Sequence, residues 1–239
     1  MHLASNALQA FYHVAWNDWG DMIRYSPGPR IRREKILSWV SEAKVNSLLD
    51  IGCGNSEFLL QVHAKIPSFE LAGADISHSV IEENKRRLPG VDFFTLDLDQ
   101  EHLPRRFDAV TCMEVVEHCQ DYRAAIKRLA EMTGKWLFIT VPCGPLFEID
   151  RRVGHTKHFS AREITDALQE SGLKVITAQR WGFPFFNLYK HAINLNPDVL
   201  CKAFLSSQKY RPKQKLVALL TYAAFKASFP WLGYQLFVS

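Results

Sequence analysis

The sequence lacks the features that mark a secreted, membrane-spanning or disordered chain. Its five cysteines are odd in number and form no C-x-x-C pair, which favours a reduced, cytoplasmic protein over a disulfide-linked one. The first residues contain no basic segment followed by an apolar one, so no signal peptide is expected. No apolar run approaches the roughly 20 residues that span a bilayer. The longest candidate, Leu216–Phe225, is more consistent with an ordinary helix.

A strong excess of one charge is also absent, but the charge that exists is unevenly placed. The net charge of +4 over 239 residues is too small to predict a nucleic-acid-binding protein. Residues 182–230 hold seven Lys and Arg against one Asp, together with nine of the 29 aromatic residues. With 47% hydrophobic residues and no repeat, the chain is expected to form one globular domain over residues 1–239.

Short apolar runs alternate with helical stretches, which indicates parallel β-α-β units. Residues 1–43 are expected to form a helical cap, in which Pro27 and Pro29 precede a helix over Arg30–Ala43. Residues 44–181 are the expected core, 182–230 a helical insert and 231–239 a final strand. Strands are expected at VNSLLDIG, ELAGADIS, VDFFTLDL, FDAVTCME, KWLFITVP, Leu173–Trp181 and GYQLFVS, with helices over 57–66, 79–88, 121–133 and 160–171.

A glycine loop, LLDIGCGNSEF, follows the first strand. Gly52 and Gly54 let the backbone turn sharply and approach a ligand closely. The dinucleotide pattern G-x-G-x-x-G would need a third glycine where Glu57 stands. Because Asp50 and Glu57 flank the loop with negative charge, it suits a cationic ligand better than a pyrophosphate.

Acidic residues end the next two strands. Asp75 lies at the place where a carboxylate can accept hydrogen bonds from both hydroxyls of a ribose. Asp97 and Leu98 follow the third strand. Asp97 could accept a hydrogen bond from the amino group of an adenine, and Leu98 could pack against the adenine ring. A single Asp after a strand is usually a turn or a cap. The recurrence at successive strand ends favours a shared ligand crevice at the carboxyl edge of the sheet.

In their order and spacing, the motifs LLDIGCGNSEF, GADIS, TLDL and FDAVTCMEVVEH resemble the class I methyltransferases that depend on S-adenosylmethionine (SAM). The resemblance implies a Rossmann-like α/β fold whose seven-stranded, mostly parallel sheet carries helices on both faces. It also implies an antiparallel seventh strand paired with the sixth, here separated from it by the insert. Ser56 departs from the third glycine that is common in the family. The implied cofactor is SAM, with S-adenosylhomocysteine as product, bound by Asp50, Gly52, Cys53, Gly54, Asp75, Ile76, Asp97, Leu98, Met113 and Glu114.

The segment after the fourth strand holds the candidate catalytic groups. If it is helical, Glu114, Glu117 and His118 share one face, and His155 and His158 follow the fifth strand. Three interpretations stay open: a structural role, His118 as general base, and a divalent metal. The E-x-x-E-H pattern resembles small-RNA 3′-end 2′-O-methyltransferases and ubiquinone-pathway O-methyltransferases, which implies a divalent metal on Glu114, Glu117, His118 and His158. Carboxylate ligands favour Mg²⁺ or Mn²⁺, and added imidazoles move the preference toward Mn²⁺, Fe²⁺ or Zn²⁺. The sequence does not favour the metal.

The N-terminal helices and the insert each have two interpretations. Tyr12, Trp16, Trp19 and Tyr25 could pack in the core, or Tyr12, Tyr25 or Arg30 could reach the methionine carboxylate of SAM. The insert could complete the core or form an apolar wall for the acceptor, and a peripheral membrane contact is less favoured.

Taken together, the sequence predicts SAM-dependent methyl transfer to a small-molecule, small or lipophilic acceptor, at oxygen. The alternatives are RNA 2′-O-methylation, although nucleic acid is disfavoured as a partner, and a SAM-fold protein without methyl transfer.

Overall fold

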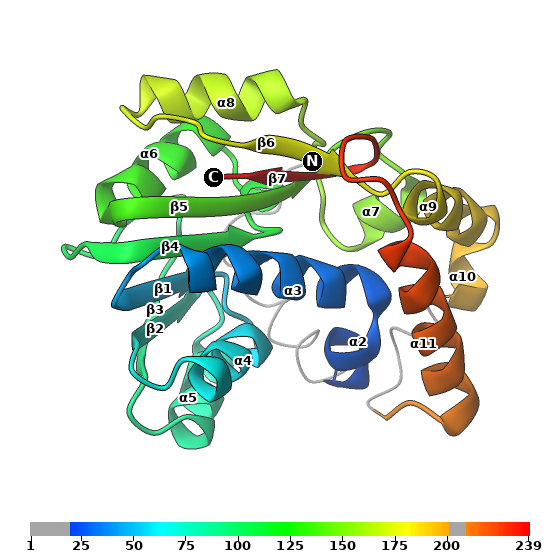
Figure 1. Ribbon diagram of the computed structural model, residues 1–239, viewed down its shortest axis with the longest axis horizontal. Coiled ribbons are helices and arrows are strands. Elements are labelled where there is room, and N and C mark those ends of the chain that lie inside the picture. Colours follow the sequence, from blue (N-terminus) through cyan, green and yellow to red (C-terminus); the bar gives the residue numbers. More distant parts are fainter. Residues whose placement is uncertain (1–19, 201–208) are drawn as a thin grey trace.

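The computed structural model describes residues 20–200 and 209–239 and contains one seven-stranded sheet (Figure 1). The strand order is β3-β2-β1-β4-β5-β7-β6, and only β7 runs antiparallel to its neighbours. The strands are β1 Ser47–Ile51, β2 Glu70–Asp75, β3 Asp92–Thr95, β4 Phe107–Met113, β5 Thr133–Pro142, β6 Ala178–Trp181 and β7 Gln235–Val238. The Rossmann-like fold with an antiparallel seventh strand is therefore confirmed.

The helices of the first two thirds of the chain follow the sequence pattern closely. They are α2 Gly20–Tyr25, α3 Pro27–Glu42, α4 Glu57–Lys65, α5 His78–Arg87, α6 Tyr122–Met132, α7 Glu148–Arg152 and α8 Ala161–Glu170. A capping box precedes α8, in which the Ser160 hydroxyl accepts a hydrogen bond from the Glu163 N–H at 3.2 Å. The expected start of α3 at Arg30 is wrong. Pro27 and Pro29 lie in its first turn, where a missing N–H breaks no hydrogen bond of the helix.

The sixth strand is shorter than the expected Leu173–Trp181. Its partner β7 ends at Val238, so the preceding residues have little strand left to pair with. Ile176 and Thr177 donate their N–H groups to the Ser239 carbonyl at 2.8 and 3.1 Å, but residues 173–177 form no ladder of their own. The chain enters the sheet only at Ala178.

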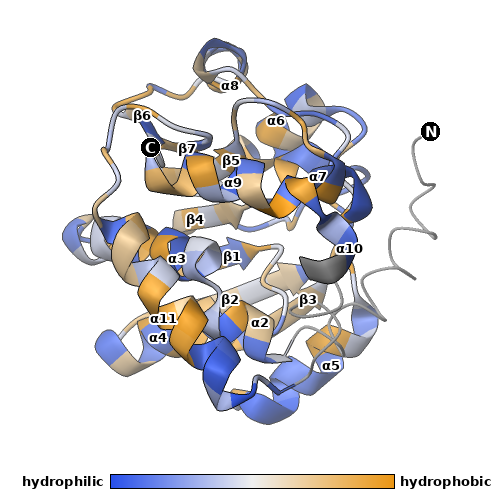
Figure 2. Ribbon diagram, turned by 90° about the vertical axis from the view of Figure 1, so that its right-hand side faces the viewer, coloured by the Kyte–Doolittle hydropathy of each residue, from blue (hydrophilic) through white to orange (hydrophobic). Residues whose placement is uncertain are grey.

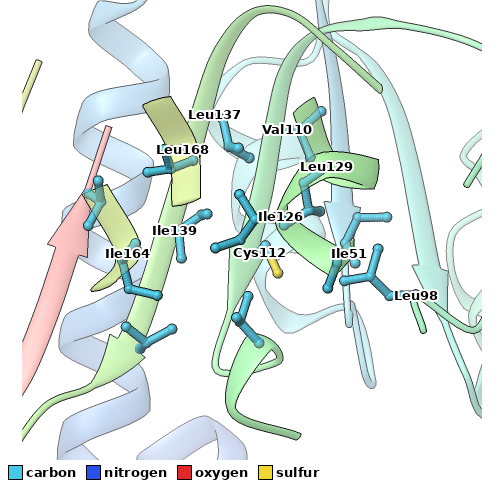
Figure 3. Packing of buried hydrophobic residues seen from close by; sticks show 14 of the residues in the cluster. Ile51, Leu98, Val110, Cys112, Ile126, Leu129, Leu137, Ile139, Ile164 and Leu168 are labelled. Atoms are coloured by element: carbon cyan, nitrogen blue, oxygen red, sulfur yellow. The ribbon is translucent and has the colours of Figure 1, made fainter. Parts of the chain in front are cut away.

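Alternate strand residues supply the two cores on the faces of the sheet. Leu49 packs in the cluster that includes Ile126 of α6 and Ile164 of α8, part of which Figure 3 shows. Its neighbour Leu48 packs on the other face, with Ile36 of α3 and further residues of α4 and α5. Burial on both faces explains why these strands are almost continuously apolar.

The insert follows β6 and precedes β7, as the sequence predicts. It contains α9 Phe185–Leu195, α10 Pro197–Leu200 and α11 Pro212–Lys226. The Tyr222 hydroxyl of α11 contacts both carboxylate oxygens of Glu34 on α3, at 2.7 and 2.6 Å. Phe186 and Phe225 pack edge to face with ring centroids 5.4 Å apart. The insert therefore stands beside α2 and α3 at the carboxyl end of the sheet (Figures 1 and 2). None of the described helices has both the length and the apolar character to cross a membrane.

Candidate functional site

A cavity of about 510 Å³ opens at the carboxyl end of the central strands, walled on the far side by α2, α3, α7, α9 and α11. Most of the candidate site residues line it: Asp50, Gly52, Cys53, Asp75, Ile76, Asp97, Leu98, Met113, Glu114, His118 and His155. Gly54, Glu117 and His158 lie behind this lining. The crevice that the acidic strand ends predict is therefore present.

The glycine loop turns tightly beneath the cavity. Gly52 has φ +70°, and a Cβ there would lie 2.2 Å from Cγ2 of Val115, so only glycine fits. The N–H groups of Gly52 and Cys53 donate to the Ala74 carbonyl at 2.8 and 3.0 Å. Ser56 takes a left-handed conformation, φ 56° and ψ 27°, which a glycine would adopt without strain. A serine in this conformation costs about 1–2 kcal/mol.

Asp75 ties the glycine loop to the end of β2. Its Oδ2 accepts from the Gly54 N–H and its Oδ1 from the Ser77 N–H, each at 2.9 Å. Burial raises the pKa of the Asp75 carboxyl to about 6, against the pull of these two backbone donors. Each carboxylate oxygen retains a further lone pair, so Asp75 can hold the loop and accept ligand hydroxyls together.

Asp50 is the second buried acid of the cavity. The Thr111 hydroxyl donates to its Oδ1 at 2.7 Å, and its side chain has no other hydrogen-bond donor among the described residues. Burial raises the pKa of Asp50 to about 7, and the negative charge of Asp75 adds to the shift. A cation in the cavity would reverse both effects, so this pair of acids favours a positively charged ligand.

Asp97 has a turn-forming role as well as a place in the cavity. Its Oδ1 accepts from the Asp99 N–H at 3.0 Å, and its carbonyl accepts from Gln100 and Glu101. Leu98 is buried beside it and lines the same cavity. Both interpretations of this acid, a turn cap and a ligand contact, are compatible with the geometry.

The expected helix over Glu114, Glu117 and His118 is wrong. The N–H of Glu114 donates to the Thr140 carbonyl of β5 at 2.9 Å. The backbone therefore takes a left-handed conformation at Glu114, with φ 59°, and does not continue as a helix. Only Val116–His118 forms a single 3₁₀ turn. The Glu114 carboxylate points toward β5 and β7, where its Oε1 accepts hydrogen bonds from the Thr140 hydroxyl at 3.1 Å and from Gln235 Nε2 at 2.7 Å. Arg32 Nη1 lies 3.4 Å from its other oxygen.

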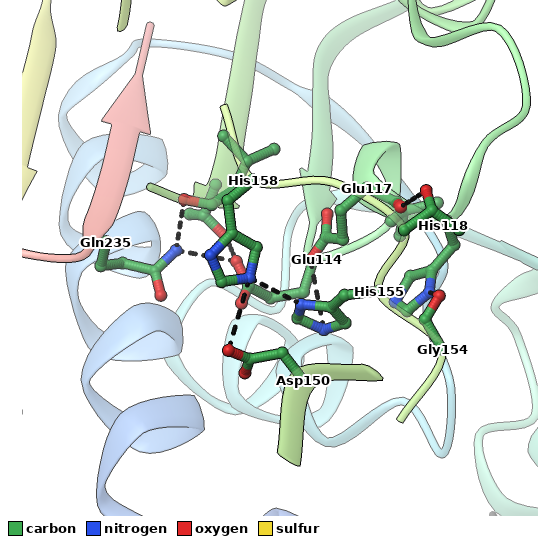
Figure 4. Close-up of polar contacts among 12 residues, drawn as sticks. Glu114, Glu117, His118, Asp150, Gly154, His155, His158 and Gln235 are labelled. Atoms are coloured by element: carbon green, nitrogen blue, oxygen red, sulfur yellow. Dashed lines mark hydrogen bonds and ion pairs between the residues drawn. The ribbon is translucent and has the colours of Figure 1, made fainter. Parts of the chain in front are cut away.

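Three histidines gather beside Glu117 (Figure 4). His118 Nδ1 lies 3.1 Å from the Gly154 carbonyl, and His158 Nδ1 lies 3.3 Å from the Gly144 carbonyl. Carbonyls only accept, so both rings carry their proton on Nδ1 and present Nε2 as an acceptor. His155 Nδ1 lies 3.2 Å from His158 Nε2 and is the donor, which leaves Nε2 of His155 as an acceptor as well.

Burial lowers the pKa of all three histidines, so they are neutral at pH 7. The Glu117 side chain is fully buried, and neither of its oxygens has a hydrogen-bond partner among the described residues, although His155 Nε2 lies 3.9 Å from Oε1. Burial raises the pKa of Glu117 well above its usual range, and the nearby Glu114 adds to the shift. An orphaned buried carboxyl is costly, which marks this group as one that fits a ligand or ion.

The predicted metal set, Glu114, Glu117, His118 and His158, is assembled only in part. Ligand atoms of Glu117, His118 and His155 all lie within 4.8 Å of one another, as do those of Asp150, His155 and His158. Glu114 is in neither group. His155 therefore replaces it. His118 has a carbonyl partner on the ring nitrogen opposite Nε2, which is an arrangement that metal-binding histidines commonly have, whereas Nδ1 of His155 contacts His158 Nε2.

Sequence reasoning missed Arg33. Arg33 is 6% exposed and lines the cavity, and within the described part of the chain its Nε has no hydrogen-bond partner. No carboxylate forms an ion pair with it among the described residues, and burial lowers its pKa to about 10. The available signal was its spacing, since Arg33 shares a helix face with the buried Ile36 and Val40.

The residues expected to reach a carboxylate lie elsewhere. Arg30 pairs with Glu34 at 3.1 Å and covers the Tyr222 ring, with its guanidinium 3.8 Å from the centroid. Tyr25 stacks on Tyr210, and neither Tyr25 nor Arg30 lines the cavity. Tyr12, Trp16 and Trp19 lie outside the described residues.

A seven-stranded sheet with one antiparallel strand, a glycine loop after β1 and acids at successive strand ends defines the class I methyltransferase fold. A family model described as a methyltransferase domain matches residues 29–178. The chain belongs to this methyltransferase family.

Curated relatives and solved structures agree with this assignment. The ubiquinone biosynthesis O-methyltransferase of Leptothrix cholodnii is 28% identical over 145 residues, which are 56% of this chain and 61% of the relative. The N-methyltransferase NodS of Bradyrhizobium japonicum, solved with S-adenosylhomocysteine, has a TM-score of 0.59 at 20% identity, covering 72% of this chain and 88% of that one. A phosphoethanolamine N-methyltransferase of Haemonchus contortus has a TM-score of 0.61 at 17% identity, covering 99% and 59%. The structural likenesses concern the fold. The chain spans less than two thirds of the length of the first of these relatives.

Proposed function

We propose that the chain binds SAM in this cavity and transfers its methyl group to a small, lipophilic acceptor at oxygen. The observation that carries the proposal is the pair of buried acids, Asp50 and Asp75, at the glycine loop. SAM brings an ammonium and a sulfonium but no phosphate, and these positive groups suit an acid-rimmed cavity. We also propose that the chain acts as one domain, with residues 44–181 binding SAM and 182–230 facing the acceptor.

Each end of SAM has a partner in this assignment. Asp75 accepts hydrogen bonds from the two ribose hydroxyls. Asp97 accepts a hydrogen bond from the adenine amino group, and Leu98 packs against the adenine ring. Asp50 faces the methionine ammonium, and Arg33 binds the methionine carboxylate through a charge-assisted pair. The remaining wall is lined by Gly52, Cys53, Ile76 and Met113. The Gly54 N–H holds the Asp75 carboxylate in place, and Glu114 is held by its contacts with Arg32 and Gln235.

The chemistry then depends mainly on position. Methyl transfer is an in-line displacement, in which the enzyme holds the nucleophile opposite the leaving sulfur. His118 lines the cavity with Nε2 as an acceptor and is neutral at pH 7, so it can take the proton of an acceptor hydroxyl. His155 packs edge to face with this ring, with the two ring centroids 4.9 Å apart. His158 accepts a hydrogen bond from His155 and so holds His155 in place.

The far wall of the cavity suits an apolar acceptor. It is formed by residues of the insert, among them Phe186, Tyr189, Ile193, Val217 and Ala218. The names of the curated relatives, O-methyltransferases of ubiquinone biosynthesis, support an oxygen nucleophile. Among the described residues of the insert that line the cavity, Lys190 is the only basic one and it pairs with Asp150, so they do not form the basic groove that RNA recognition needs.

A divalent metal is a second candidate component, favoured by the orphaned carboxyl of Glu117. Glu117, His118 and His155 would hold it, and when bound it would lower the pKa of an acceptor hydroxyl. The mixture of one carboxylate and two imidazoles suits Mn²⁺, Fe²⁺ or Zn²⁺ better than Mg²⁺. Dialysis against EDTA followed by Mn²⁺ or Mg²⁺ tests this component, and activity that ignores both treatments excludes it.

The test of the proposed function has two stages. Isothermal titration with SAM and S-adenosylhomocysteine should show a single site per chain, while NAD should not bind. Release of S-adenosylhomocysteine is then measured with phenols and catechols that carry apolar tails of increasing length. Binding of SAM without product release from any acceptor would favour a SAM-fold protein without methyl transfer, and no binding of SAM would refute the assignment.

A further inference from the structure

The insert exposes an unusual amount of apolar surface. Leu216, Leu219 and Leu220 of α11 are 56%, 54% and 62% exposed, and their helical spacing places them along one side. Leu188 and Leu195 of α9 are 63% and 87% exposed. All large apolar side chains that the described residues expose, except Ile176, lie within residues 183–232. In Figure 2 the hydrophobic side of α11 faces the viewer, on the same side of the molecule as α9.

This apolar surface adjoins the cavity. Val217 lines the cavity and is also 51% exposed, so it marks part of the mouth. Ala218 and Thr221 of α11 and Ile193 of α9 line the inner side of the same two helices. The exposed leucines therefore lie on the same two helices whose inner sides form part of the apolar cavity wall.

Positive charge borders the leucines. Lys209, Arg211 and Lys213 are exposed at the N-terminal end of α11, and their side chains form no ion pair among the described residues. Lys213 precedes Leu216 by about one helical turn. The only acid of residues 182–230 is Asp198, and it pairs with Arg152 at 2.6 Å. Basic side chains beside exposed leucines match the surface of an anionic bilayer.

We propose that α9 and α11 dock on an anionic phospholipid bilayer, and that a lipophilic acceptor passes from the bilayer into the cavity beside Val217. The docking stands on exposure and charge alone, whereas the acceptor route rests on the proposed function. A second copy of the chain suits this face less well. Because α11 carries basic side chains at both ends and no acidic one, a two-fold contact between two α11 helices would bring like charges together in either orientation, which disfavours it.

The experiment is sedimentation of the full chain with vesicles in the absence of SAM. Vesicles of phosphatidylcholine alone are compared with vesicles that also contain phosphatidylglycerol, at low and at physiological salt. The chain should sediment with the anionic vesicles, and salt should weaken the partition. Leu216→Gln with Leu220→Gln should lower the partition at least about tenfold, because two exposed leucines no longer enter the bilayer. Ile176, 57% exposed and outside the insert, supplies the matched control Ile176→Gln.

The charge is tested separately. Arg211→Gln with Lys213→Gln should lower the partition about 25-fold at low salt, since each basic residue contributes roughly fivefold near an anionic surface. Lys127→Gln, an exposed lysine of α6, is the control and should change nothing. All these side chains are exposed, so the variants should fold, and circular dichroism verifies this.

Each contrary result has a distinct meaning. If the wild type ignores anionic vesicles, or if the leucine variant partitions like the wild type, the docking proposal is refuted. Light scattering that shows a dimer, dispersed by the leucine substitutions, would assign the face to a contact between copies instead. SAM titration of the same preparations separates the two proposals, because a chain that binds vesicles but not SAM refutes the proposed function and leaves the docking intact.

Discussion

Asp75→Asn tests the site at its centre. The substitution preserves the size of the side chain but replaces a carboxylate oxygen with an amide NH₂, which cannot accept a hydrogen bond. In the present structure both oxygens already accept from backbone N–H groups, those of Gly54 and Ser77, at 2.9 Å. One of these bonds must therefore be lost, together with one acceptor for a ribose hydroxyl and the negative charge that strengthens the other.

The expected loss of SAM affinity is about 2–3 kcal/mol, or roughly 30- to 150-fold. It corresponds to the loss of one hydrogen bond to a charged acceptor and the weakening of the other, less the desolvation that already raises the pKa of Asp75 to about 6. Isothermal titration at a pH above that pKa measures the loss directly, with S-adenosylhomocysteine as a second ligand that shares the ribose.

Asp92→Asn is the matched control. Asp92 starts the neighbouring strand β3, at the opposite end of the sheet, and its side chain is 62% exposed. This variant should bind SAM like the wild type. Unchanged affinity in Asp75→Asn, or an equal loss in both variants, would mean that the ribose does not lie at the end of β2.

Three further predictions follow from the same site. His118→Ala should lower turnover about 10²–10⁴-fold while SAM affinity changes little, and a variant that keeps its kcat would remove His118 from the chemistry. Gly52→Ala should lower the free energy of unfolding, measured by urea denaturation, by about 2–4 kcal/mol, because the added Cβ would lie 2.2 Å from Val115. The control Gly90→Ala also has a positive φ but has open space around it, so it should lower the same free energy by only about 1–2 kcal/mol. The raised pKa of about 7 at Asp50 means that the folded protein binds more protons than the unfolded chain, so stability without SAM should fall as the pH rises from about 4 to 7. SAM should then raise the Tm more at pH 8 than at pH 5, and an equal shift at both would contradict a cation beside Asp50.

Local patterns predicted the framework because local physics determines it. The glycine loop is the clearest case, since the sharp turn at Gly52 leaves no room for a side chain. The alternation of apolar runs and helical stretches likewise predicted the β-α units, because strands buried on both faces must be apolar throughout. The helix expected over residues 160–171 was predicted to within one residue of its start, since Ser160 is the N-cap of α8 and Ala161 its first residue.

Non-local contacts explain what the sequence pattern missed. The E-x-x-E-H spacing is compatible with a helix, but a carbonyl of β5 captures the N–H of Glu114 and turns the chain into a left-handed conformation. Neither the pairing of Glu114 with Gln235 nor the burial of Arg33 is visible in a window of neighbouring residues. Their side-chain roles depend on how α3 and β7 approach the sheet, which tertiary packing decides.

The position of β7 has a consequence for synthesis on the ribosome. This strand lies between β5 and β6 in the sheet and pairs with both. Both β5 and β6 precede the insert in the chain, so they leave the exit tunnel before the insert and β7 do. Until β7 arrives, the edge of β5 is open to other strands, and Glu114 lacks the amide of Gln235 that holds it. Nascent chains interrupted within the insert should therefore be prone to aggregate and should lack a finished cavity, so that activity starts only when translation has passed the last strand.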